Sequence, residues 1–252
     1  MEALAFKFLN MSVALIILII LVVCLAGFTQ GMTGFGFGLV AMPLLLMLMN
    51  LKEAAALTVL LNLLVCGMTF FSTRNHYSFR QGLGLVAGTC LGVPVGVYAL
   101  VRLDEILLLR VLGGAMVLMS ANELILARGR AIHVSPRLGF PFGLLSGGLS
   151  GAFGMGGPPA VAFAYSQPWS KEQIVALLQV VFGLSAVLRL LLLGSAGLLA
   201  RPLLLTGLWS LLPLAGAILL GQKCFARIPQ PVLRKATFVF LGLMGLKYLF
   251  FP

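Results

Sequence analysis

Two glycine-rich segments of the sequence have residue types that could bind an anion. They are Thr33–Gly38 and Ser150–Gly157, and each opens with a hydroxyl residue. Glycine at this density destabilises a continuous helix, by roughly 1 kcal/mol per residue relative to alanine. Pro158 and Pro159 stop a helix because proline lacks the N–H group. We therefore expect the backbone to break at both segments. A break exposes free N–H groups and the positive dipole end of the next helix, an arrangement that binds anions.

Polar side chains close to the two breaks could add to these amides. Gln30, Thr33 and Ser150 flank the breaks and could hydrogen-bond an oxyanion, although such residues can equally join helices to each other. Arg189 lies about two turns from the end of its apolar run, deep enough to hold an anion unless its long side chain reaches the membrane interface. The breaks and their polar neighbours together form a candidate anion site.

Asn62 and Gln179 extend the candidate site, because they occupy matching positions 117 residues apart in the apolar runs that follow the breaks. The alternative for the glycines is that pairs such as Gly34/Gly38 only let helices pack closely. The predicted substrate-binding residues are Gln30, Thr33, Gly34, Gly36, Gly38, Asn62, Ser150, Gly151, Gly154, Gly156, Gly157, Gln179 and Arg189.

Other chemistries fit the sequence less well. Gly148–Gly151 matches the G-x-S-G of rhomboid intramembrane proteases, but a nucleophilic Ser150 needs a histidine base within hydrogen-bond reach. His76 and His133 both lie in polar connectors. A cation carrier should have carboxylates inside its spans, and only Glu123 approaches that position. The four cysteines form no C-x-x-C pair. We expect neither an enzyme nor a metal or organic cofactor.

The composition indicates that the candidate site residues are positioned by membrane-spanning helices. Of 252 residues, 61% are hydrophobic and 9% are charged, whereas a soluble domain has about 25% charged residues. This balance excludes a soluble globule and a disordered chain. A helix needs roughly 20 apolar residues to span a bilayer. The apolar runs are 8–30, 35–50, 54–73, 83–101, 106–125, 138–152, 158–166, 173–195, 202–221 and 236–252.

The chain repeats itself, with residues 1–126 as the first transmembrane repeat and 127–252 as the second. Gly31, Thr33 and Gly34 match residues 117 positions later, and Lys52–Glu53 matches Lys171–Glu172. Several features in the same order at nearly one offset indicate two structural repeats. Each repeat is predicted to contain a glycine-broken, re-entrant-like helical hairpin followed by three transmembrane helices.

The net charge of +11 predicts the topology rather than a nucleic-acid partner, because Lys and Arg gather in cytoplasmic loops. Ten of the 17 Lys and Arg residues lie in the connectors 74–81, 127–137, 167–172 and 222–235, against five assigned to the other side. With these four connectors in the cytoplasm, both termini lie outside and the two repeats are inverted. The expected fold is an all-α polytopic membrane protein with inverted repeats, a recurrent transporter architecture.

The two segments also resemble a known family. Gly31–Leu45, together with Lys52–Ala54, is similar to the first repeat of the TauE/SafE sulfite exporters, also called toluene-sulfonate uptake permeases, and Gly147–Pro159 is similar to the second. The resemblance extends over nearly the whole chain. It implies a secondary transporter of the bacterial inner membrane that carries sulfite, a small organosulfonate or a related anion. Gly156–Pro159 departs from many relatives, which have a third glycine there.

The predicted mechanism is alternating access, with the anion bound between two hairpin tips that meet near the midplane. The expected partners are a small anion and the lipid bilayer. A proton or a sodium ion is the candidate coupling ion, a homodimer is the candidate assembly, and no nucleic acid is expected. A passive anion channel is the alternative function.

Overall fold

A computed structural model describes residues 13–34, 36–73, 82–126, 134–224 and 230–252, and every regular element in these ranges is a helix. The predicted connector 74–81, most of 127–137, and both histidines lie outside them. The helices are α2 (Val13–Thr33), α3 (Phe37–Leu45), α4 (Leu51–Thr73), α5 (Leu83–Arg102), α6 (Glu105–Ala121), the π-helix η2 (Asn122–Leu126), the 3₁₀ turn η3 (Pro136–Leu138), α7 (Gly139–Phe153), α8 (Gly157–Tyr165), α9 (Lys171–Ser195), α10 (Arg201–Cys224) and α11 (Gln230–Phe250).

Six of these helices are long and apolar enough to cross a membrane: α2, α4, α5, α6, α9 and α10. Their outer faces carry exposed apolar side chains, such as Leu212 at 85% and Trp209 at 74% exposure, which suits contact with lipid rather than water. The prediction of an all-α, multi-pass membrane protein is confirmed. Helix α11 also has 21 residues, but it carries Arg234, Lys235 and Lys247 and is not among the six.

Two helices are too short to cross a bilayer. Helices α3 and α8 have nine residues each, or about 14 Å at 1.5 Å per residue, against roughly 30 Å of hydrocarbon. Each follows a longer helix after a three-residue gap, at 34–36 and 154–156. The predicted backbone breaks are therefore present at both glycine-rich segments.

The role expected of Pro158 and Pro159 was wrong. They do not end α7 but lie in the first turn of α8, where a missing N–H group costs no hydrogen bond and the fixed φ of proline suits the helix. Gly154 ends α7 instead, with φ at +70°. That left-handed conformation is one that glycine adopts without steric cost.

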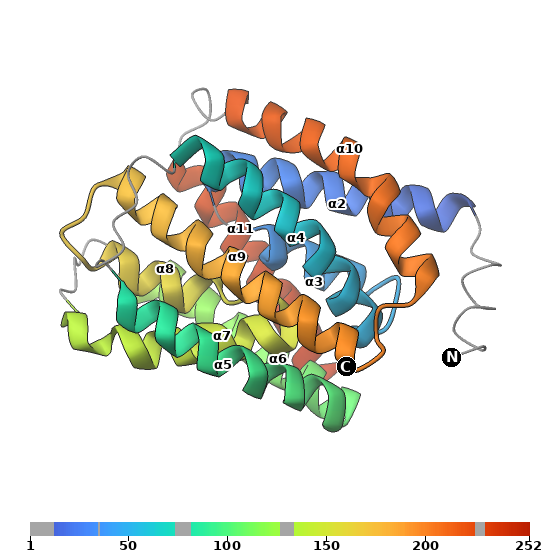
Figure 1. Cartoon of the computed structure of the whole chain (residues 1–252), viewed down its shortest axis with the longest axis horizontal. Coiled ribbons are helices and arrows are strands. Elements are labelled where there is room, and N and C mark those ends of the chain that lie inside the picture. Colours follow the sequence, from blue (N-terminus) through green and yellow to red (C-terminus); the bar gives the residue numbers. More distant parts are fainter. Residues whose placement is uncertain (1–12, 35, 74–81, 127–133, 225–229) are drawn as a thin grey trace.

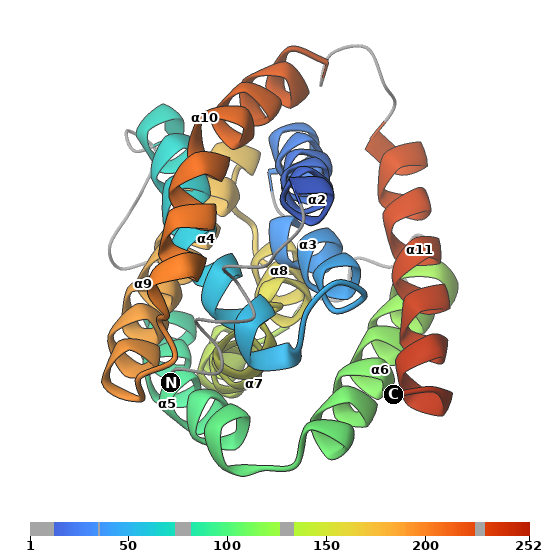
Figure 2. The same cartoon turned by 90° about the vertical axis from the view of Figure 1, so that its right-hand side faces the viewer.

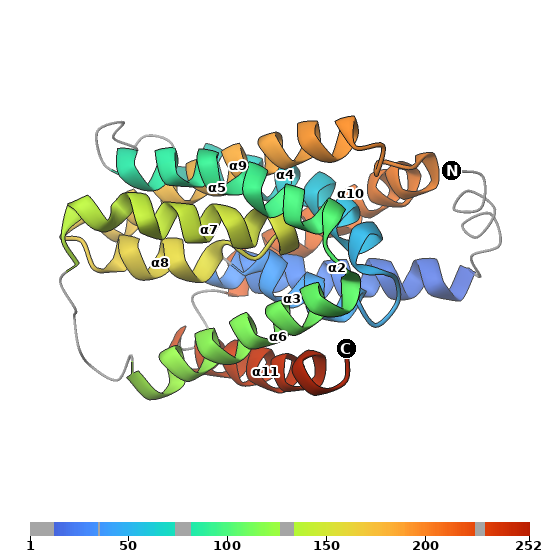
Figure 3. The ribbon, with the colours of Figure 1, turned by 90° about the horizontal axis from the view of Figure 1, so that it is seen from below.

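The order of helices is the same in both halves of the chain: one long helix, one short helix and three long ones. Corresponding helices run in opposite directions, so that α2 and α4 run right to left in Figure 1, whereas α7 and α9 run left to right. The halves exchange partners, because α5 packs on α7 and α10 packs on α2. Helix α4 packs on α9, and α6 packs on α11 at one side of the molecule (Figures 2 and 3).

The contact between α5 and α7 is made by glycine against backbone. A Cβ atom added to Gly88 would lie 2.1 Å from the carbonyl oxygen of Phe140, and one added to Gly143 would lie 2.2 Å from that of Leu85. No side chain fits at such distances, so the two helices touch along their backbones. The α7–α8 hairpin is thus held tightly against α5.

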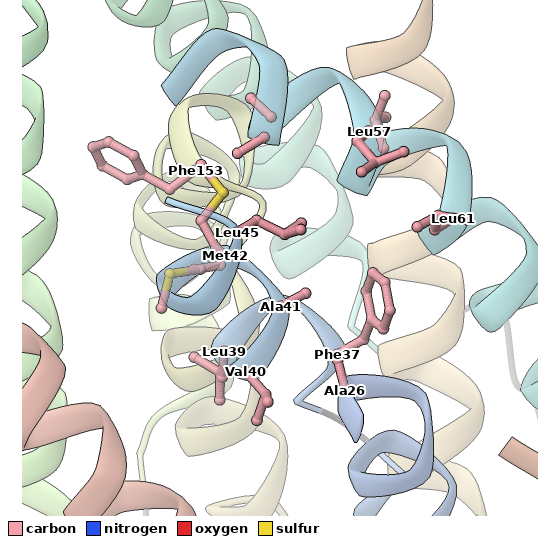
Figure 4. Close-up of a cluster of buried hydrophobic side chains, with 14 of the residues drawn as sticks. Ala26, Phe37, Leu39, Val40, Ala41, Met42, Leu45, Leu57, Leu61 and Phe153 are labelled. Carbon is pink, nitrogen blue, oxygen red and sulfur yellow. The ribbon is translucent and has the colours of Figure 1, made fainter. Parts of the chain in front are cut away.

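Helix α3 lies inside the molecule and forms much of its apolar core. Phe37, Ala41, Met42 and Leu45 are buried, and the core around them includes Leu57 of α4 (Figure 4). Tyr248 of α11 donates a hydrogen bond to the carbonyl oxygen of Pro43 at 2.7 Å. The short helix is therefore surrounded by protein, the condition under which an irregular backbone is tolerated inside a membrane.

Candidate functional site

The first break is held by the side-chain amide of Gln30. Its Nε2 donates to the carbonyl oxygen of Gly34 at 3.2 Å, and its Oε1 accepts from the N–H of Phe37 at 3.0 Å. Gly34 and Gly36 have φ values of +76° and +116°, which explains why glycine is needed at these turns. Gln179 of α9 also donates to the Gly34 oxygen, at 2.9 Å. Two amides from different halves of the chain thus fix one carbonyl group of the break.

The second break is held by a hydroxyl group. The N–H of Gly154 donates to the carbonyl oxygen of Ser150 at 2.7 Å, which closes the last turn of α7. The Ser146 hydroxyl donates to the carbonyl oxygen of Gly156 at 2.6 Å, across the gap between the two helices. As in the first break, a side chain of the longer helix fixes the chain before the short helix begins.

The two breaks meet in the interior of the molecule. A Cβ atom added to Gly38 would lie 2.1 Å from the carbonyl oxygen of Gly154, so α3 touches the second break directly. A cavity of about 30 Å³ lies at this junction, room for one or two waters or the oxygens of a small ion. Its lining residues are Gln30, Gly36, Phe37, Gly38, Leu39, Asn62, Ser150, Gly154, Met155, Gly156, Gly157 and Phe182.

Four backbone N–H groups at this cavity make no hydrogen bond within the described ranges: those of Gly38, Leu39, Gly156 and Gly157. The first two belong to the first turn of α3, and Gly157 opens α8. The positive dipole ends of both short helices therefore face one cavity. Free amides at a helix start favour a negatively charged group.

Arg189 lies behind the second break rather than in the cavity wall. It is 1% exposed, and its Nη2 donates to the carbonyl oxygen of Ala55 at 3.3 Å. A Cβ atom added to Gly154 would lie 2.8 Å from its Nη1. Its Nε has no partner, and no acidic side chain pairs with it in the described parts of the chain. The positive charge next to Gly154 is thus not neutralised by the protein there.

The structure brings most of the predicted site residues together. Eight line the cavity: Gln30, Gly36, Gly38, Asn62, Ser150, Gly154, Gly156 and Gly157. Gly34, Gln179 and Arg189 lie directly behind that wall, in contact with residues of the breaks.

Two predicted residues are used for helix geometry and packing. Thr33 directs its hydroxyl to the carbonyl oxygen of Thr29, one turn earlier in α2, at 2.9 Å. Gly151 packs on α5, where an added Cβ would lie 2.3 Å from the carbonyl oxygen of Val93. The helix-packing alternative considered for the glycines therefore describes Gly151 well.

Several residues near the site were not identified from the sequence. Ser185 of α9 is 1% exposed, and its hydroxyl contacts that of Ser150. Thr58 of α4 donates to Ala55 and lies 3.5 Å from the position a Gly154 Cβ would take. Ser185 precedes Arg189 by one turn, and Thr58 precedes Asn62 by one turn. Helical spacing from residues already chosen could have found both.

The competing sites are less supported by the geometry. The Ser150 hydroxyl contacts another hydroxyl group, that of Ser185, and both histidines lie outside the described residues. Glu123 lies in the π-helix η2, beside a different cavity of about 290 Å³ between α6 and the α7–α8 hairpin. The carboxylate expected of a cation carrier is therefore not at the junction of the breaks.

Comparison with known proteins agrees with these features. The family model described as sulfite exporter TauE/SafE matches residues 19–248. A curated relative, "Probable sulfite/organosulfonate exporter TauE" of Cupriavidus necator, is 30% identical over 170 residues. That alignment covers 64% of this chain and 65% of the relative, just under two thirds of its length. No solved structure matches the chain. Because the family model covers nearly the whole sequence, the chain belongs to the sulfite exporter TauE/SafE family of membrane transporters.

Proposed function

We propose that this protein carries sulfite, or a small organosulfonate or related anion, across the membrane, with the anion bound where the two helix breaks meet. One observation carries the proposal: four residues of the two breaks that line a single cavity have backbone N–H groups without a hydrogen-bond partner among the described residues, and a buried guanidinium group lies next to Gly154. The three oxygens of a sulfite or sulfonate group are suitable acceptors for such amides.

The charge of the site supports an anion over a cation. Each helix start contributes the equivalent of about half a positive charge, and Arg189 adds a full one. Among the described residues, no carboxylate lines the cavity or pairs with Arg189. A cation would be repelled at this position, and an anion would be stabilised by desolvated positive charge on two sides.

We further propose that residues 1–126 and 127–252 are inverted-topology repeats that operate by alternating access. The opposite directions of corresponding helices and the exchanged packing of α5 with α7 and α10 with α2 support this. In inverted-repeat transporters, one part of the protein rocks against the other around a fixed midplane site. The junction of the two breaks would serve as that site here.

The membrane orientation is also a proposal. The ends of α6 and α8 and the starts of α7 and α9 lie at one end of the molecule, while α2 starts and α11 ends toward the other (Figures 1 and 3). In the sequence, connectors rich in Lys and Arg adjoin these helix ends, which supports a cytoplasmic location for this end. The termini would then lie outside the bacterial inner membrane. Export follows the name of the relative, which is a probable exporter.

The experiment is counterflow of radiolabelled sulfite in proteoliposomes, with sulfonates, sulfate, oxalate and acetate as competitors. We expect saturable exchange that a good substrate inhibits. Exchange with a different labelled anion would keep the carrier and change its substrate. A passive channel would instead conduct without saturation or counterflow, and no flux from folded protein would exclude both.

The same liposomes address the coupling ion and the assembly. Imposing a proton gradient and a sodium gradient separately shows which ion, if either, drives net flux. Light scattering of the purified protein in detergent tests the proposed homodimer.

A further inference from the structure

The hydroxyl group of Ser150, a cavity-lining residue, contacts the hydroxyl group of a second, buried serine, Ser185. Ser150 of α7 lines the cavity, whereas Ser185 of α9 is 1% exposed and lies behind Ser150. Their hydroxyl groups are hydrogen-bonded to each other. One turn further along both helices, Gly154 faces Arg189. Helix α9 thus meets the last two turns of α7 with a hydroxyl and then a guanidinium group.

The two serines have two hydroxyl protons between them to donate. Each hydroxyl group has one proton and can accept as well as donate. The mutual contact uses one proton of the two, and neither side chain makes a further hydrogen bond in the described residues. One hydroxyl proton is therefore left without an acceptor, and an unmade hydrogen bond in a buried place is unfavourable.

The two possible directions of the contact are not equivalent. If Ser150 donated to Ser185, the spare proton would belong to Ser185, which is buried away from the cavity. If Ser185 donates to Ser150, the spare proton belongs to Ser150 and can point into the cavity. The second direction gives the spare proton a possible acceptor, namely an oxygen of a bound anion or a water.

We propose that Ser185 is a positioning residue: it donates to the Ser150 oxygen and so makes Ser150 a hydrogen-bond donor to an oxygen of the transported anion. This inference rests on the proposed function, because it needs an oxyanion in the cavity. Ser185 itself does not touch the anion. The ligand class is a compact oxyanion whose oxygens accept hydrogen bonds from Ser150 and from the amides of the breaks.

The test is sulfite counterflow with Ser150→Ala, Ser185→Ala and the double variant. Removing a hydrogen bond to a charged group should raise KM by about tenfold in Ser150→Ala. Ser185→Ala should raise KM by about three- to tenfold at nearly unchanged maximal rate. The double variant should be no worse than Ser150→Ala alone, because both changes remove the same interaction. Ser185→Cys, with a weak S–H donor, should fall between wild type and Ser185→Ala.

Ser210→Ala is the matched control, because Ser210 is a fully buried serine of α10 whose hydroxyl donates within its own helix at 2.7 Å. It should keep the wild-type KM. A wild-type KM in Ser185→Ala, a loss of maximal rate alone, or additive effects in the double variant would overturn the positioning role and leave the transporter proposal intact. Absence of any anion exchange by folded wild-type protein would overturn both.

Discussion

At the scale of single residues, Arg189 supplies a full positive charge next to the candidate site. A buried cation without a carboxylate partner is costly to fold, and the contact of Arg189 with Ala55 offsets only part of that cost. Charged side chains are rare inside membrane-spanning segments, and those present typically take part in the protein's function. An anion beside Gly154 would supply the missing negative charge.

Substitution of Arg189 tests this role. Arg189→Ala should raise the KM for sulfite by at least about tenfold, equivalent to ~1.4 kcal/mol. Arg189→Lys should recover part of the loss, because it keeps the charge but not the planar guanidinium. Counterflow kinetics measure both. Arg110→Ala, at an exposed position of α6, is the control and should transport normally. An unchanged KM in Arg189→Ala would remove this residue from the site.

Gly154 is a second position that has a specific requirement, because its backbone conformation and surroundings suit only glycine. Its φ of +70° and the proximity of Arg189 disfavour any side chain. Gly154→Ala should lower stability by roughly 1–2 kcal/mol and also impair transport. Gly148→Ala, inside the helix that Gly154 terminates and with open space around the added atom, should be neutral or slightly stabilising. Thermal unfolding in detergent compares the two variants, and equal melting temperatures would contradict the expectation.

The residues of the site were only partly predictable. Polar residues next to the breaks pointed to Gln30 and Ser150, and the 117-residue match with Gln179 pointed to Asn62; all three line the cavity. Ser185 was missed because the matching position in the first half, 117 residues earlier, is Met68. Comparison of the repeats therefore could not indicate a hydroxyl group there. Whether Arg189 lines the cavity or lies behind it depends on three-dimensional packing that spacing does not encode.

At the scale of helices, the sequence predicted which helices exist better than it predicted what the prolines between them do. The ten apolar runs correspond in order to the long and short helices, as with 138–152 for α7 (Gly139–Phe153) and 158–166 for α8 (Gly157–Tyr165). Hydrophobic length and glycine density are local properties, so they are visible in sequence. The place of Pro158 and Pro159 was not visible in sequence, because proline is common both just after the end of a helix and in the first turn of the next one.

The close contact of α5 with α7 yields a prediction about packing. A Cβ atom added to Gly92 would lie 2.3 Å from the carbonyl oxygen of Leu144. Gly92→Val should therefore push the helices apart and lower stability by about 3 kcal/mol or more. Gly114→Val in α6, where an added Cβ meets nothing within 4 Å, should be tolerated. Unfolding in detergent measures the difference, and similar stability of the two variants would refute the close contact.

At the scale of the whole molecule, the directions of the helices and the distribution of charge lead to the same arrangement. The helix ends next to the basic connectors lie together at one end of the molecule, although the connectors are far apart in sequence. Packing the two halves in opposite directions places their breaks at a common junction. A site shared between repeats is where alternating access needs its substrate.

Cysteine accessibility in a variant lacking the four native cysteines tests the orientation. Ser135 comes just before η3 and α7, Ala196 comes just after α9, and both residues are exposed. The start of α7 and the end of α9 lie at opposite ends of the molecule (Figure 1). If the basic end is cytoplasmic, a membrane-impermeant maleimide added to intact cells should label Ala196→Cys and should label Ser135→Cys only after lysis. The reverse pattern would invert the molecule in the membrane. Labelling of both positions in intact cells would show that they share one side, and this would refute both the topology and the inverted repeats on which the transport mechanism depends.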